Sequence, residues 1–69
     1  MSQFIDLLGN MGNAYSLLGL ANRWGKQLDL DTKKIQNDMM SGDYDHLLDV
    51  FEKHFSGLFE WNRDELEDY

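Results

Sequence analysis

The 69-residue sequence contains no cysteine and no proline, and it has few basic residues. Without cysteine, disulfide bonds and thiolate metal sites are excluded. The lack of proline favours a helical chain, because proline breaks helix interiors. The sequence has six lysines and arginines and thirteen aspartates and glutamates, which gives a net charge of −7. Direct binding to nucleic acid is therefore not expected, since that function needs a basic surface.

A chain of this length has room for one domain with a small hydrophobic core. Small folds that lack disulfides often gain stability by oligomerisation, so we expect this protein to self-associate. The N-terminus has no basic segment of the kind that begins a secretion signal. The longest uncharged run, residues 7–22, is too short and too polar for a membrane span. We therefore expect a cytoplasmic protein that does not contact a membrane.

Apolar residues recur at helical spacing in three segments of the chain. The first helix is predicted over residues 2–25, with Ser2 as its N-cap. It would divide into two helices if Gly9 or Gly12 interrupts it, because glycine weakens a helix interior. The second helix is predicted over residues 32–40. The chain should therefore contain three helices, or four if the first one is divided.

The third predicted helix, residues 43–60, has the clearest pattern. On a wheel of 100° per residue, its apolar side chains fill one half-circle and its charged side chains fill the other. The apolar half comprises Tyr44, Leu47, Leu48, Val50, Phe51, His54, Phe55, Leu58 and Phe59. Asp43 is a suitable N-cap for this helix, as Asp31 is for the second. We predict an all-α fold, with one helical domain at residues 1–61 and an acidic C-terminal tail at residues 62–69.

Residues that could support catalysis or hold a metal are few. No nucleophile elbow or glycine-rich turn places a serine beside either histidine, so we predict no enzymatic activity. His46 and Asp49 have the spacing of half a helical metal site, and Asp43 and Asp45 lie close by. Acids at a helix start are, however, expected as caps and as partners of the helix dipole. We therefore predict neither a metal nor a cofactor.

Four small residues are spaced three, four and three positions apart in the first predicted helix. They are Gly9, Gly12, Ser16 and Gly19. Small residues at this spacing form a smooth stripe that lets another helix approach closely. The stripe could pack against the third helix of the same chain, or it could mediate self-association. Both interpretations remain open.

An acidic row with aromatic neighbours is predicted along the third helix and beyond its end. The acids are Asp45, Asp49, Glu52 and Glu60, and the row continues into Asp64, Glu65, Glu67 and Asp68. The aromatic residues beside it are Phe59, Trp61 and Tyr69. Helical neighbours in this row are about 5–6 Å apart along the axis, a spacing comparable to that of phosphates in nucleic acid. The row could bind a basic surface, or it could simply keep the protein soluble. Aromatic residues often supply much of the binding energy of an interface.

The leading hypothesis is a non-catalytic protein-binding module, or a small inhibitor, that presents an acidic helical surface to a basic protein partner. One alternative is a structural homo-oligomer packed through the glycine and serine stripe. Another is a nucleic-acid-mimicking inhibitor of a DNA- or RNA-binding protein. In size and charge the chain is similar to many small phage- or plasmid-encoded inhibitors, an analogy that assigns no role to any residue.

Overall fold

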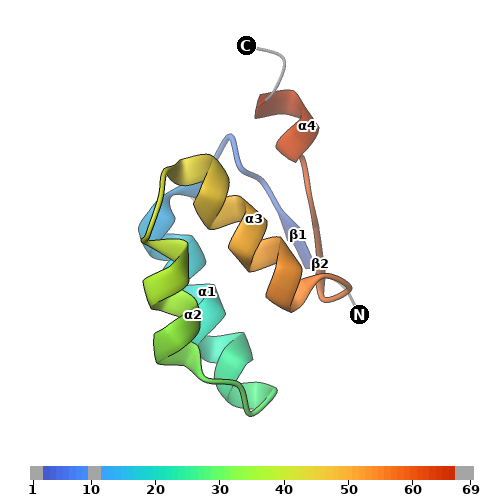
Figure 1. Ribbon diagram of the computed structural model, residues 1–69. Coiled ribbons are helices and arrows are strands. Elements are labelled where there is room, and N and C mark those ends of the chain that lie inside the picture. Colours follow the sequence, from blue (N-terminus) through green and yellow to red (C-terminus); the bar gives the residue numbers. More distant parts are fainter. Residues whose placement is uncertain (1–2, 10–11, 67–69) are drawn as a thin grey trace.

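A computed structural model describes residues 3–9 and 12–66, and it shows a small, mostly helical domain with a short sheet (Figure 1). The elements are β1 (Gln3–Ile5), α1 (Ala14–Gln27), α2 (Thr32–Met39), α3 (Tyr44–Phe55), β2 (Phe59–Trp61) and α4 (Arg63–Leu66). The predicted all-α fold is therefore incomplete. Segments near the two ends of the chain, both predicted to be helical, are extended strands.

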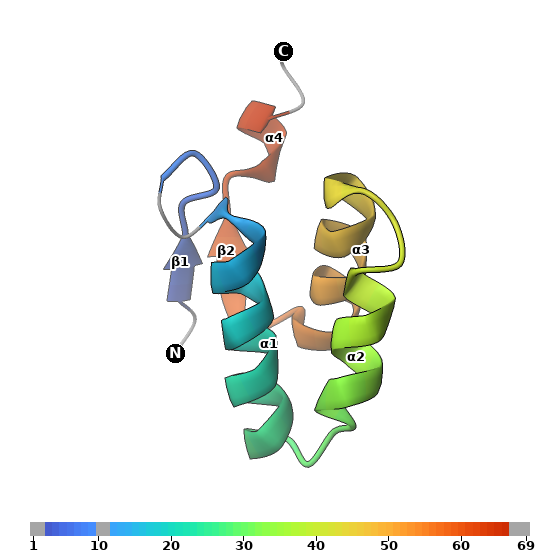
Figure 2. The ribbon, with the colours of Figure 1, turned by 90° about the vertical axis from the view of Figure 1, so that its left-hand side faces the viewer.

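β1 and β2 pair in parallel, with Gln3 opposite Phe59 and Ile5 opposite Trp61. The amide of Gln3 donates to the carbonyl oxygen of Leu58 at 3.1 Å. Parallel strands need a long crossover connection, and here α1, α2 and α3 provide it. The sheet lies beside the helices, and β1 is its outer strand (Figure 2).

The first helix begins at Ala14 rather than at the predicted residue 2, because the chain turns before it. The amide of Gly9 donates to the carbonyl oxygen of Asp6 at 3.1 Å. A side chain at Gly12 would collide with the backbone of Leu7, so only glycine allows these two segments to approach. α1 then starts at Ala14, where the side chain of Asn13 caps it by accepting the amide of Ser16 at 2.8 Å. The predicted Ser2 cap lies outside the described residues.

The second helix and the start of the third are confirmed. The carboxylate of Asp31 accepts the amide of Lys34 at 3.1 Å, and that of Asp43 accepts the amide of His46 at 2.9 Å. Each aspartate therefore caps a helix as predicted. The end of the third helix was predicted wrongly. α3 stops at Phe55, and the chain then turns through Gly57, whose φ of 96° is in the left-handed region that favours glycine.

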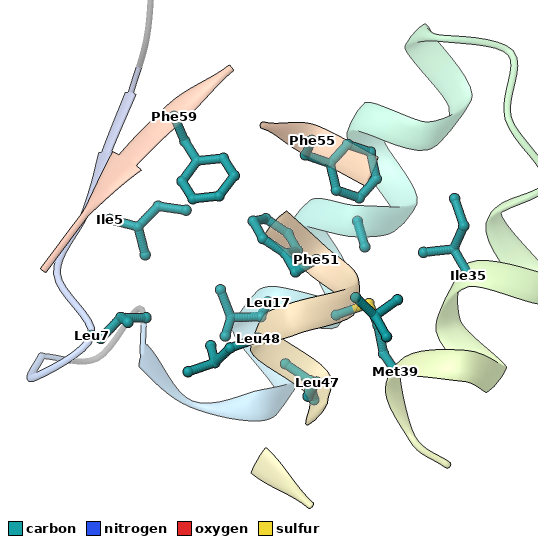
Figure 3. Close-up of a cluster of buried hydrophobic side chains, with 12 residues drawn as sticks. Ile5, Leu7, Leu17, Ile35, Met39, Leu47, Leu48, Phe51, Phe55 and Phe59 are labelled. Carbon is teal, nitrogen blue, oxygen red and sulfur yellow. The ribbon is translucent and has the colours of Figure 1, made fainter. Parts of the chain in front are cut away.

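The hydrophobic core lies between the three longer helices and the sheet (Figure 3). Its buried residues are Ile5, Leu7, Leu17, Ala21, Ile35, Met39, Leu47, Leu48, Val50, Phe51, Phe55 and Phe59. Phe51 and Phe55 are fully buried, as the helical wheel predicts. Trp24 of α1 packs on them, with ring centroids 5.6 Å and 5.8 Å away. Leu58, which the wheel places on the buried face, is exposed.

Asn62 joins the segments that follow the two strands. Its side-chain oxygen accepts the amide of Leu7 at 2.7 Å, and its Nδ2 donates to Asp6 at 2.8 Å. Nδ2 also lies 3.2 Å from a carboxylate oxygen of Glu65 in α4. The segment predicted as a tail therefore begins with a residue whose hydrogen bonds connect the two ends of the described chain.

We predict that Phe51→Ala lowers the free energy of unfolding by about 3–5 kcal/mol, because it leaves a cavity among packed aromatic rings. Urea denaturation followed by circular dichroism would measure this loss. Tyr15→Ala is the matched control, since the side chain of Tyr15 is 87% exposed. Equal denaturation midpoints for the two variants would contradict the position of Phe51 in the core.

We predict that Asn62→Ala lowers the free energy of unfolding by about 1–3 kcal/mol, because it leaves the part-buried amide of Leu7 without an acceptor. Hydrogen exchange should also show faster exchange of the Leu7 amide. Asn37→Ala, at an exposed position in α2, should leave stability almost unchanged. Unchanged exchange at Leu7 in the Asn62 variant would show that this hydrogen bond does not form.

Candidate functional site

Three of the predicted site acids lie on the outer side of α3. Asp45, Asp49 and Glu52 are all exposed, and they follow one another at about one helical turn. Their exposure follows from the amphipathic pattern, since the opposite side of α3 contributes Leu48, Phe51 and other residues to the core. Glu60 is also exposed, but it lies on β2 rather than on the helix.

Arg63 interrupts this acidic row. Its guanidinium is 2.8 Å from the carboxylate of Asp49 and donates to the backbone carbonyl of Asp45 at 3.4 Å. The side chain of Arg63 is only 17% exposed, and its guanidinium carbon lies 6.0 Å from the ring centroid of Trp61. Asp49 therefore has a positively charged neighbour. This pairing could not be inferred from the sequence, because Arg63 comes close to α3 only through the path of β2.

A surface depression of about 410 Å³ brings two of the remaining acids together. Its lining residues are Phe4, Glu52, Ser56, Phe59, Glu60 and Trp61. Glu52 and Ser56 come from the end of α3, whereas Glu60 lies on β2 and Phe4 on β1. The turn at Gly57 places these segments beside one another. The depression therefore combines two carboxylates with aromatic side chains from both strands.

The aromatic residues predicted as anchors differ in their exposure. Phe59 is 7% exposed and belongs to the core, where its ring centroid lies 5.0 Å from that of Phe51. Its prediction as a partner anchor needs correction, because most of its surface is already covered. Trp61 is half-buried against Phe59 and still lines the depression. Tyr69 lies outside the described residues. Phe4, which was not predicted as a partner residue, is 58% exposed.

The glycine and serine stripe does not exist as a helical surface. Gly9 and Gly12 precede α1, whereas Ser16 and Gly19 lie within it. Gly12 is buried against Leu7, and Gly19 has open space around it. The prediction that these residues share one helix face is wrong, because the chain turns at residues 7–9 and α1 begins only at Ala14. Self-association of the protein remains a prediction.

The hydroxyl of Tyr44 donates a hydrogen bond to the carbonyl oxygen of Gly12, which ties the segment before α1 to the start of α3. Burial raises the pKa of this phenol above its usual value, because the surrounding protein disfavours the phenolate. The wheel assigned Tyr44 to the apolar face of the third helix. Its exposed fraction of 37% shows that it lies at the edge of that face.

Ser41, His46 and Asp38 form a cluster between α2 and α3, but its geometry differs from that of a catalytic triad. Nε2 of His46 lies 3.0 Å from the hydroxyl of Ser41, 2.9 Å from the backbone carbonyl of Asp38 and 3.4 Å from its carboxylate. A triad needs the serine and the acid on opposite ring nitrogens. The hydroxyl also donates to the carbonyl of Asp38 at 2.7 Å. These contacts therefore link the end of α2 and the connection after it to the first turn of α3.

Comparisons with known proteins assign no family to the chain. No family model matches it, and neither a curated protein nor a solved structure does. Among residues 3–9 and 12–66, no group of three or more histidine and acidic side chains could hold a metal ion. None of the described helices is both long and apolar enough to cross a membrane. A function must therefore be argued from the surface of the domain.

We predict that Tyr44→Phe lowers the free energy of unfolding by about 0.5–1.5 kcal/mol at pH 7, through loss of its hydrogen bond. The neutral phenol is favoured in the folded state, so its contribution is complete below the unfolded pKa of about 10 and falls as the pH rises through the higher folded pKa. Urea denaturation at pH 7 and pH 10.5 should therefore show a smaller difference between variant and parent at pH 10.5. Tyr15→Phe, the exposed control, should match the parent throughout.

Proposed function

We propose that this protein is a non-catalytic binding module that holds a basic segment of a protein partner in the depression between α3 and the sheet. The observation that supports this function best is the position of Glu52 and Glu60 on the same aromatic-lined depression. Binding there could inhibit the partner by covering the basic surface that the partner uses for another ligand. As predicted from the sequence, recognition would be electrostatic. Its acidic residues would be Glu52 and Glu60 near the end of α3, rather than the whole row along that helix.

The charges support a cationic ligand. Within the described part of the chain, Glu52 and Glu60 form no ion pair, whereas Asp49 is paired with Arg63. Two carboxylates without partners create a negative potential at the depression, and a lysine or arginine side chain would reduce it. The net charge of −7 would also attract a basic protein from a distance and increase its rate of association.

The aromatic side chains beside the two carboxylates support a protein segment as the ligand rather than a free metal ion or an ammonium ion. Phe4 exposes more than half of its side chain beside the acids, and Trp61 contributes a partly covered ring. Interfaces often combine such aromatic contacts with a polar rim. A volume of about 410 Å³ is within the usual range for ligand pockets. The depression can therefore accept a long basic side chain together with an apolar neighbour.

The two alternative functions have less support. A nucleic-acid mimic requires a continuous row of negative charge, and Arg63 lies in the middle of that row beside Asp49. A homo-oligomer packed through the predicted small-residue stripe requires a helical surface, and α1 begins only after Gly12. Light scattering would detect assembly through other exposed apolar residues.

The proposal can be tested with two synthetic eight-residue peptides, one alternating lysine with leucine and the other alternating glutamate with leucine. Titrations followed by amide chemical shifts should show that only the lysine peptide binds, with shifts centred on residues 52–61 and Phe4. We predict that the double variant Glu52→Gln and Glu60→Gln weakens this binding at least fivefold, or by about 1 kcal/mol.

The matched control is the double variant Asp45→Asn and Asp64→Asn, which removes the same charge from exposed positions outside the depression. It should weaken binding much less than the glutamate variant. Equal weakening in both variants would show that net charge, and not the depression, attracts the peptide. Equal binding of the glutamate peptide would reject electrostatic recognition altogether.

A further inference from the structure

We infer that a second site, in the groove between α2 and α3, binds a small organic anion with a short apolar chain. The groove has a volume of about 330 Å³. Its lining residues are Leu30, Asp31, Lys34, Ile35, Asp38, Lys53 and His54. None of them lines the depression that carries the proposed function. The two sites can therefore be tested separately.

Two lysines from different helices line this groove. Lys34 belongs to the first turns of α2, and Lys53 belongs to the last turn of α3. α2 and α3 pack directly against each other (Figure 2), and Lys34 and Lys53 both line the groove between them. This is unusual on a protein with a net charge of −7 and only six lysines and arginines. An anion between the helices could contact both ammonium groups.

The partners of the charged groups favour an anion over a cation. Asp31 and Asp38 balance the two lysines in formal charge, but both acids have other contacts. The carboxylate of Asp31 accepts the amide of Lys34 as a helix cap, and Asp38 lies 3.4 Å from Nε2 of His46. Within residues 3–9 and 12–66, neither ammonium group forms an ion pair. Both carboxylates of the groove therefore accept hydrogen bonds from neighbouring groups, whereas the two ammonium groups are left to bind an anion.

The groove also has an apolar surface that a simple inorganic anion would not use. Ile35 is 5% exposed, and it forms a wall that is continuous with the core. Leu30, in the connection before α2, is 38% exposed. The ring of His54 is partly buried at the other side. A ligand with a carboxylate at one end and an aliphatic chain at the other would match the lysines and these side chains together. The small volume favours a compact molecule.

The test uses three probes with the same six-carbon chain: hexanoate, hexylammonium and 1-hexanol. Titration of the full chain, followed by amide chemical shifts, should show hexanoate binding with shifts at residues 30–38 and 53–54. Its Kd should be at least fivefold lower than that of either other probe. Tighter binding of hexylammonium would show that Asp31 and Asp38, rather than the lysines, determine which ligand binds, and it would overturn the inference. Absence of chemical-shift changes at these residues with hexanoate would also overturn it.

Variants then test the role of the two cations. The double variant Lys34→Gln and Lys53→Gln should remove the preference for hexanoate over 1-hexanol. The matched control, Lys26→Gln and Lys33→Gln, removes the same charge from exposed positions that do not line the groove, and it should keep that preference. Thermal melting would check that all variants remain folded. Loss of the preference in both double variants, or in neither, would overturn the assignment.

Discussion

Contact between the aromatic rings of α1, α3 and β2 is the interaction on which the rest of the domain depends. Trp24 lies 6.0 Å from Phe59, and Phe51 contacts the rings of both strand residues Phe59 and Trp61. A strand pair of three residues has little stability of its own in water. The sheet is therefore stabilised by the aromatic residues of β2, because Phe59 belongs to the core and Trp61 packs against it. This packing also positions the residues of β2 that line the depression.

The proposed peptide site and the proposed anion site use different sides of α3. Glu52 and Ser56 line the depression beside the sheet, whereas Lys53 and His54 line the groove beside α2. Successive residues on a helix are separated by about 100°, so neighbouring positions can serve opposite surfaces. The residues of α3 between these two sides, such as Phe51 and Phe55, are buried and fix the helix between its neighbours. α3 therefore separates the depression that holds Glu52 and Glu60 from the groove that holds Lys34 and Lys53.

Local signals in the sequence were sufficient to predict α2, the start of α3 and most of the core residues. Asp31 and Asp43 act as caps within three residues of their partners, and such contacts depend little on the rest of the fold. The sheet could not be predicted in this way, because three residues are too few to distinguish alternation from helical periodicity. Phe59 fell on the apolar arc of the wheel and is indeed buried, but as part of a strand. Gly57 was the available signal for the end of α3.

The candidate site was predictable only in part for a related reason. The exposure of Asp45, Asp49 and Glu52 follows from the pattern of one helix, which the sequence contains. The pairing of Asp49 with Arg63, and the position of Glu60 near Glu52, depend on how β2 returns beside α3. Sequence alone therefore identified the charged residues but not which of them lack partners.

The parallel pairing of β1 with β2 also affects how the molecule folds. Gln3 and Phe59 are separated by nearly the whole described chain, so closing the sheet carries a large loop-closure entropy. Because contacts between residues near in sequence form faster than distant ones, we expect the helices to form before the strands pair. Opening would follow the reverse order, starting at the edge where β1 is exposed to solvent. A ligand bound across both strands would slow that opening and thereby link occupancy of the surface to the lifetime of the folded state.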